Sequence, residues 1–318
     1  MAGAEYYGRG TAIMTQNELV SVFVSILNTD RVLAEEPMSN HTTFKTGGNA
    51  ELLLVLHAEE ALKAVLEILE REQLPYTLIG RGSNLLVSDE GLPGVVLKLA
   101  DGFDEVCVRE GGLVYAQAGA TLRSACLGAI HAGLSGLEFA GGIPGCVGGG
   151  VAMNAGAYGG ELKDVVEYVR ILTPARKVQT FTNEQMRFSY RKSAVQGSGS
   201  VILGAAFRLQ PGDRDQSMET FNCLNARRKE KQPLNFPSAG STFKRPQGNY
   251  ASALIDQCNL KGFTIGGAQV SEKHAGFIIN LGNASSRDIY ELICYVRQEV
   301  MKKTGILLEP EVRLLGEF

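Results

Sequence analysis

Several features that mark other classes of protein are missing from this 318-residue sequence. It has no broad basic excess: 31 Lys and Arg against 34 Asp and Glu give a net charge of −3, which argues against a nucleic-acid partner. No segment approaches the roughly 20-residue apolar run of a membrane span, and the N-terminal residues lack the apolar core of a signal peptide. We therefore expect a soluble, cytoplasmic protein that binds neither nucleic acid nor membrane.

Clustered metal ligands are also missing. The six cysteines are scattered, with no CxxC pair and no group of cysteine and histidine. This spacing argues against a structural zinc site and indicates reduced, mostly buried thiols. No metal site is expected.

Glycine, in contrast, is concentrated in one stretch. Nine of the twenty residues from Gly141 to Gly160 are glycine, and the stretch carries no charge. Glycine lets the backbone approach a ligand closely and adopt positive φ angles, and successive free N–H groups form a concave site for an anion such as phosphate. A tightly packed structural turn is the alternative.

A second glycine loop joins two short apolar runs, residues 76–79 and 85–87, that are typical of strands. This loop, Gly80–Asn84, has no Gly-Lys-Ser/Thr and is therefore not a Walker loop. It also lacks the third glycine and the following helix of a dinucleotide fingerprint. Neither common nucleotide fold is favoured, but the two glycine loops together could bind phosphate groups.

Helical and β periodicities predict a mixed fold of two or three subdomains. Thr15 and Glu18 have the capping-box spacing at the start of the first helix. A break in composition at residues 211–213 predicts a domain boundary. The predicted helices begin near residues 15, 59, 121, 215, 252 and 287, and the predicted strands cover residues 51–56, 76–79, 85–87, 106–109, 113–118, 165–172, 178–181, 201–209, 276–281, 306–308 and 312–315.

Seven segments occur together in the order and spacing of one known family. They are TFKTGG (Thr43–Gly48), IGRGSNLLVSD (Ile79–Asp89), GIPGCVGG (Gly142–Gly149), MNAGAYG (Met153–Gly159), YRKS (Tyr190–Ser193), SAGSTFKRP (Ser238–Pro246) and LEPEVRLLG (Leu308–Gly316). Over roughly residues 35–316 the chain resembles the UDP-N-acetylenolpyruvoylglucosamine reductase family. Its members are flavoenzymes that use NADPH to make UDP-N-acetylmuramate for bacterial peptidoglycan.

The resemblance implies an α+β fold: the FAD-binding fold of the vanillyl-alcohol-oxidase (PCMH) type in two subdomains, plus an α+β substrate-binding domain. We expect residues 1–100 to form the first FAD-binding subdomain, with 306–318 returning to it, 101–211 the second, and 212–305 the substrate-binding domain. The expected ligands are non-covalent FAD, NADPH as co-substrate and a small-molecule UDP-sugar. The expected state is a monomer.

The resemblance also implies roles for individual residues. The residues expected at FAD come from the two glycine loops and from later arginines, which could supply positive charge: Gly80, Arg81, Gly82, Ser83, Asn84, Gly142, Ile143, Gly145, Gly148, Asn154, Arg228 and Arg313. The expected substrate contacts are Tyr190, Lys231 and His274. For Arg228, Arg313 and His274, a solvated surface position is the alternative.

Reduction of an enolpyruvyl group adds a hydride to the terminal carbon and a proton to the carbon that bears the carboxylate. Flavin supplies the hydride, and donors near the developing enolate should contribute most to catalysis. The resemblance makes Ser241 the proton donor, while Arg191 and Glu311 stabilise the enolic intermediate. Alternatively, Ser241 is a turn residue, Arg191 a surface cation and Glu311 an exposed carboxylate.

Two departures from the family pattern leave open which side chain covers the substrate. Some members carry an insertion after the YRKS-type motif whose tyrosine covers the substrate, and some have asparagine where this chain has Arg245. Both features fit the shorter form of the family. Two rival functions are another oxidoreductase on the same flavin fold and a non-enzymatic nucleotide-sugar-binding protein, which would be colourless.

Overall fold

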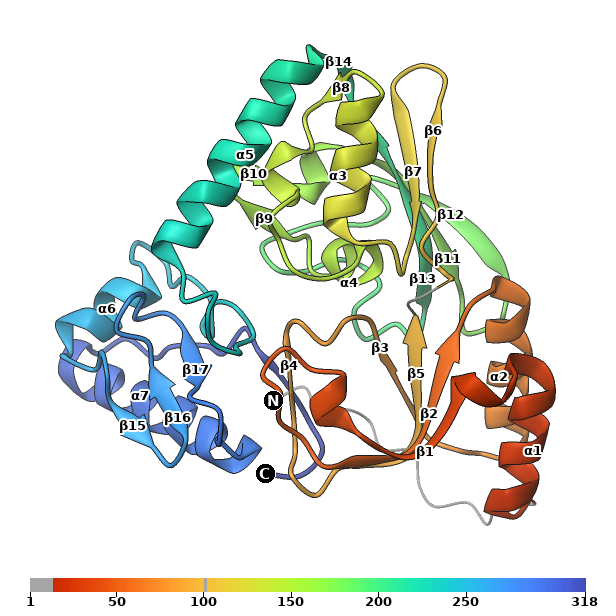
Figure 1. Ribbon diagram of the computed structural model, residues 1–318, viewed down its shortest axis with the longest axis horizontal. Helices are drawn as coiled ribbons and strands as arrows, with labels where there is room; N and C mark the ends of the chain where they lie inside the picture. The colour runs from red at the N-terminus through yellow and green to blue at the C-terminus, as the bar shows by residue number, and fades with distance from the viewer. Residues whose placement is uncertain (1–13, 100–101) are drawn as a thin grey trace.

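Three larger sheets with their helices and three two-stranded pairs make up the protein, described here as a computed structural model over residues 14–99 and 102–318. We call the larger sheets with their helices the first, second and third units in chain order (Figure 1). In that view α5 runs from the second unit to the third, and the C-terminal segment returns from the third unit to the first.

The first unit is a four-stranded sheet in the order β1-β2-β5-β3. Strand β1 is antiparallel to β2, and β5 is parallel to both β2 and β3. Leu62, Val65 and Leu69 recur at helical spacing in α2 and are buried against this sheet, which explains why the segment is helical. The elements are α1 (Gln16–Leu27), β1 (Val32–Pro37), β2 (Asn49–Leu56), α2 (Glu59–Arg71), β3 (Tyr76–Ile79) and β5 (Leu92–Leu99). The capping box predicted for α1 is present.

The other face of this sheet carries a parallel pair, β4 (Leu85–Val87) and β18 (Arg313–Leu315). Val87 and Leu53 belong to one small apolar cluster there. The last strand of the chain therefore lies directly beside the strand that follows the Gly80–Asn84 loop.

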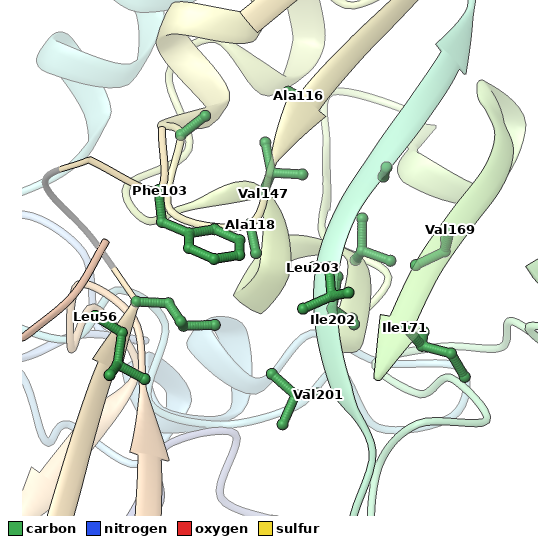
Figure 2. Close-up of a cluster of buried hydrophobic side chains, with 14 of the residues drawn as sticks. Leu56, Phe103, Ala116, Ala118, Val147, Val169, Ile171, Val201, Ile202 and Leu203 are labelled. Carbon is green, nitrogen blue, oxygen red and sulfur yellow. The ribbon is translucent and has the colours of Figure 1, made fainter. Parts of the chain in front are cut away.

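The second unit is an antiparallel five-stranded sheet in the order β12-β11-β13-β7-β6. Every residue of β13 except Arg208 is buried. Helix α4 packs on β13, and Phe103 points into a cluster that contains Ala118 and Val147 (Figure 2). The elements are β6 (Val106–Arg109), β7 (Leu113–Gln117), α3 (Leu122–His131), β8 (Leu134–Ser135), α4 (Val147–Ala152), β9 (Gly156–Ala157), β10 (Gly160–Glu161), β11 (Val166–Leu172), β12 (Val178–Thr182), β13 (Val201–Arg208) and β14 (Gln210–Pro211).

The third unit is a three-stranded antiparallel sheet packed against two helices. Gly305 adopts a φ of +73° and ends α7 as a left-handed cap, as its position in the sequence predicts. Its elements are α6 (Ala251–Gln257), β15 (Thr264–Ile265), β16 (Ala268–Val270), β17 (Ile278–Asn280) and α7 (Ser286–Thr304), and α5 (Arg214–Lys231) leads into it from the second unit. Short 3-10 turns lie at Thr29–Arg31, Met38–Asn40, Glu138–Ala140 and Leu162–Asp164.

Some expected elements differ in the structure. The strand predicted at residues 306–308 is wrong: the segment is irregular, and Leu308 is buried in the core of the third unit. No range was predicted for helix α4 or for eight of the strands: β1, β5, β8, β9, β10, β14, β15 and β16. Helix α4 is rich in glycine, a poor helix former, but a Cβ on Gly148 would lie only 3.0 Å from the Cβ of Ala118. Tertiary packing therefore sets this helix.

The domain limits remain predictions. The limit between residues 100 and 101 lies outside the described residues. At the limit after residue 211, α5 follows in sequence, but Phe221 of this helix is buried in the core shared by the first and second units. Helix α5 thus belongs partly to the second unit and partly connects it to the third.

All six cysteines are free thiols. Cys126, Cys146 and Cys258 are buried, Cys223 is exposed, and burial raises the pKa of the Cys126 thiol to about 12. Within residues 14–99 and 102–318 there is no cluster of three metal-ligating side chains. None of the helices in these ranges combines the length and the apolar character needed to cross a bilayer.

Asp89 ties the first unit to the third. Its carboxylate accepts hydrogen bonds from the backbone N–H groups of Ser286 (2.8 Å) and Arg287 (2.9 Å) in the first turn of α7. Negative charge is favoured there because the first N–H groups of a helix have no partner within it. A second tie is a buried hydrogen bond from Asn280 Nδ2 to the carbonyl oxygen of Phe44 at 2.9 Å.

We expect Asp89→Ala to lower the free energy of unfolding by about 1–3 kcal/mol, because two N–H groups lose a charged acceptor. Denaturant unfolding of the purified protein measures this change. Asp256→Ala is the control, since it removes only the exposed ion pair with Lys261 and should have little effect. Equal effects of the two substitutions would show that Asp89 does not hold the units together.

Candidate functional site

The two glycine loops predicted from the sequence lie against each other. Ser83 Oγ donates a hydrogen bond to the carbonyl oxygen of Pro144 at 3.1 Å. A Cβ on Gly80 would lie 2.4 Å from Cys146 Sγ, and one on Gly145, where φ is +122°, would lie 2.8 Å from Ser83 Oγ. Gly145 is therefore favoured by its positive φ, and a side chain at Gly80 would require Cys146 to move.

Two cavities adjoin these loops. The main cavity, about 490 Å³, is lined by residues of all three units, and the second, about 480 Å³, lies between the first and second units. The walls of both include the same loop residues: Arg81, Ser83, Ile143, Pro144 and Gly145. The glycine loops thus form a shared boundary between two spaces of ligand-binding size.

The loops offer unused hydrogen-bond donors. Five backbone N–H groups in the loops donate no hydrogen bond to another described residue: those of Arg81, Gly82, Ser83, Gly142 and Gly145. Free backbone N–H groups in such turns attract anions.

Arg228 and Arg313 add positive charge to the main cavity. Within the described part of the chain neither guanidinium has a carboxylate partner. Loss of surrounding water lowers the pKa of both side chains. Arg228 is half-buried and Arg313 is exposed to the cavity. Partly desolvated, unpaired charge is unfavourable, so an anionic ligand would stabilise Arg228 and would also attract Arg313.

The second cavity is also basic. Lys45, Lys98 and Arg123 line it together with Arg81, and its lining includes no acidic residue. Lys98 Nζ lies 3.2 Å from His41 Nδ1. Sequence analysis quoted Thr43–Gly48 as a motif but assigned no site here, because these cations come from separate elements with no common spacing.

Backbone pairing brings Ser241 and Glu311 into the main cavity together. The N–H of Glu311 donates a hydrogen bond to the carbonyl oxygen of Thr242 at 2.8 Å. The N–H of Lys244 donates one to the carbonyl oxygen of Glu309, also at 2.8 Å. Ser241 is exposed in the cavity wall. The segments that carry these residues are about 70 positions apart, so only the fold places them side by side.

Arg191 reaches Glu311 from the second unit. Its Nε donates to Glu311 Oε1 at 2.7 Å, and the side chains are only 19% and 13% exposed. Burial raises the pKa of Glu311, while Arg191 and Lys244 oppose that effect. The alternatives of a surface cation and an exposed carboxylate are therefore wrong for this pair.

The three predicted substrate contacts lie outside the lining of the main cavity. Tyr190 is 45% exposed, and its hydroxyl accepts a hydrogen bond from the N–H of Arg245 at 3.0 Å. Lys231 is exposed at the end of α5. His274 packs edge-on against Phe277, which does line the cavity, and burial lowers the pKa of the His274 imidazole.

The other predicted FAD residues divide into three groups. Gly142 lines only the second cavity. Asn154 lines neither cavity and is fully buried, and its side chain is hydrogen-bonded within the protein. The remaining predicted FAD residues all line the main cavity: Gly80, Arg81, Gly82, Ser83, Asn84, Ile143, Gly145, Gly148, Arg228 and Arg313.

The main cavity also includes residues that sequence analysis missed. Gln196, Gln232 and Phe277 line it. The only available signal was position, since Gln196 closely follows the YRKS motif and Gln232 follows Lys231. Their residue types carry no specific chemical pattern.

Comparison with known proteins agrees with this arrangement. Residues 50–182 match the family model "FAD binding domain", and residues 232–315 match "UDP-N-acetylenolpyruvoylglucosamine reductase, C-terminal domain". The chain is 45% identical over 304 residues to the UDP-N-acetylenolpyruvoylglucosamine reductase of Lachnoclostridium phytofermentans, covering 95% of this chain and 98% of that protein. It is also 45% identical to that of Clostridioides difficile, covering 96% and 100%.

A solved structure, UDP-N-acetylenolpyruvylglucosamine reductase (MurB) from Thermus caldophilus, is similar with a TM-score of 0.76 and 33% identity, covering 90% of this chain and 98% of that one. These matches confirm the predicted fold class, an α+β fold that includes an FAD-binding domain. They also establish what kind of protein this is: the chain belongs to the UDP-N-acetylenolpyruvoylglucosamine reductase family of oxidoreductases.

Proposed function

We propose that this protein reduces the enolpyruvyl group of UDP-N-acetylenolpyruvoylglucosamine to give UDP-N-acetylmuramate, with NADPH as the reductant and FAD as a non-covalent cofactor. The observation that carries this proposal is the common cavity. Ser241, Arg191 and Glu311 line the same space as the two glycine loops. A flavin oxidoreductase for another substrate, or a binding protein without activity, would have no need for these three groups together.

The residues present fit FAD. The free N–H groups of the glycine loops and the unpaired Arg228 and Arg313 suit a pyrophosphate. A dinucleotide has two ends, and the loops separate two cavities of similar size. At Gly80 and Gly145 a Cβ would contact a side chain of the opposite loop, so glycine at these positions lets the two loops pack closely between the cavities.

FAD, when bound, would carry a hydride from the nicotinamide of NADPH to the terminal carbon of the enolpyruvyl group. The protein's own contribution is to bind, orient and protonate. One main cavity must serve both NADPH and the UDP-sugar, so we infer that the two bind in turn, in ping-pong order.

Arg191, held in place by Glu311, would stabilise the negative charge that spreads onto the substrate carboxylate as the enolic intermediate forms. Glu311 engages only Nε of the Arg191 guanidinium, and the other guanidinium nitrogens form no hydrogen bond with the described residues. They remain available to a carboxylate. Preorganised donors of this kind, partly removed from water, lower the barrier because they need little reorganisation during the reaction.

Ser241 would donate the proton to the carbon that bears the carboxylate, which completes the reduction. Gly240 before it has a φ of +76°, and the N–H of Thr242 after it donates to the carbonyl oxygen of Gly276 at 2.8 Å. The backbone around Ser241 is thus fixed, while its hydroxyl makes no hydrogen bond to the described residues. Lys231 would meet the phosphates of the nucleotide substrate, and Tyr190 and His274 are the other proposed substrate contacts.

Arg228→Gln and Arg313→Gln should each weaken FAD binding about tenfold or more, because hydrogen bonds to charged groups contribute about 1.5–3 kcal/mol. The apoprotein should keep its thermal stability, since neither substitution breaks an ion pair. Titration of apoprotein with FAD, followed by flavin fluorescence, measures the affinity. Arg214→Gln, at the exposed start of the same helix as Arg228, is the control. Unchanged affinity in both variants would place the pyrophosphate elsewhere.

Ser241→Ala should separate the two half-reactions. Reduction of the flavin by NADPH needs no proton from Ser241 and should stay near the wild-type rate. Reoxidation by the enolpyruvyl substrate should slow by about 10²–10⁴-fold, as expected for loss of a positioned acid. Anaerobic stopped-flow absorbance in single turnover measures both steps. Equal slowing of both would mean that Ser241 supports the fold or the cofactor and is not the proton donor.

A further inference from the structure

Arg191 lies in an unfavourable backbone conformation. Its φ is +56°, in the left-handed region that residues with long side chains rarely adopt. It belongs to a tight turn in which Ser189 and Lys192 exchange two backbone hydrogen bonds of 3.1 Å each. Such a conformation costs on the order of 1–3 kcal/mol and persists only where the surrounding structure holds it.

Asn154 holds one side of this turn. Its Nδ2 donates to the carbonyl oxygen of Ser189 at 3.1 Å and to Glu161 Oε2 at 2.9 Å, while its Oδ1 accepts from the N–H of Lys163 at 2.9 Å. Two acceptors face the amide nitrogen and a donor faces the amide oxygen, so this network allows only one orientation. The side chain is 0% exposed.

Gln196 holds the other side. Its Nε2 donates to the carbonyl oxygen of Ala152 at 2.7 Å and to that of Arg191 itself at 3.2 Å. Ser193 Oγ donates to the same Ala152 oxygen at 2.7 Å. Both sides of the Arg191 turn are therefore anchored to the end of helix α4, which begins at the glycine loop of the proposed FAD site.

We propose that Asn154 and Gln196 are positioning residues that act through Arg191: they fix its turn so that the guanidinium meets both Glu311 and the substrate carboxylate. This inference rests on the proposed function, in which Arg191 stabilises the enolate. The physical reason is that Glu311 holds the guanidinium by a single bond, at Nε. Without a fixed backbone, the direction of its remaining N–H groups is free, and a displacement of about 1 Å can cost about 10²-fold in rate.

Asn154→Asp is the main test, because it keeps the oxygen that accepts from Lys163 and removes the donor to Ser189 and to Glu161 Oε2. It also places a second carboxylate beside Glu161, so the uncharged second variant must give the same slowing of reoxidation. Gln196→Met is the second variant, in which both donated bonds are lost. In each, reoxidation of the flavin by the enolpyruvyl substrate should slow by about 10–100-fold. In Asn154→Asp, whose side chain lines neither cavity, reduction by NADPH should stay within about twofold of wild type and FAD affinity should not change.

Asn183→Asp is the matched control. The Asn183 Nδ2 also donates to two carbonyl oxygens of the second unit, those of Lys163 and Val166, at 2.7 Å each, but touches neither end of the Arg191 turn. It should leave both half-reactions unchanged.

Hydrogen exchange of the apoprotein gives a readout independent of activity. The Ser189 and Lys192 amides should exchange faster in Asn154→Asp than in wild type or Asn183→Asp.

A double-mutant cycle with Arg191→Ala decides between positioning and a merely structural role. If Asn154 acts through Arg191, Asn154→Asp should slow reoxidation by less than about twofold in the Arg191→Ala background. Additive effects, or unchanged exchange of the turn amides, would overturn the inference while leaving Ser241 and Glu311 in their roles. Normal reoxidation in Arg191→Ala alone would instead overturn the proposed function, and the inference with it.

Discussion

The contact between the two glycine loops is the constraint on which the rest of the site depends. Gly80 and Gly145 lie so close to Cys146 and Ser83 that a methyl group at either glycine would force the Cys146 or Ser83 side chain to move. This contact joins the first and second units and leaves a cavity on each side of the loops. It also leaves several backbone N–H groups without a partner in the described chain, where only an anion or water can satisfy them.

The chemistry of the site follows from what is attached to these loops. Helix α4 starts at the second loop and ends at the anchors of the Arg191 turn. Strand β4 follows the first loop and pairs with β18, the strand just after Glu311. Each loop therefore positions one partner of the Arg191–Glu311 ion pair. Asp89 fixes the third unit, which carries Ser241, against the first.

Local chemistry explains which parts could be predicted from the sequence. Helix α7 and the Thr15 cap were predicted correctly because periodicity and capping residues are local signals. Helix α4 was missed because tertiary contacts override the low helix propensity of glycine. Asn154 was expected at FAD because its motif adjoins the glycine loop, but its hydrogen bonds run to Ser189, Glu161 and Lys163. Which backbone a side chain reaches depends on long-range packing, and one sequence does not contain that information.

The most direct test of this account is the flavin content of the purified protein. We expect a yellow protein with about one FAD per chain, and all of the flavin should appear in the supernatant when the chain is denatured and precipitated. Release is expected because Cys146, the cysteine in the glycine loops, is buried against Gly80. A colourless protein whose thermal stability does not change when FAD is added would contradict the account, and flavin that stays with the precipitated chain would contradict non-covalent binding.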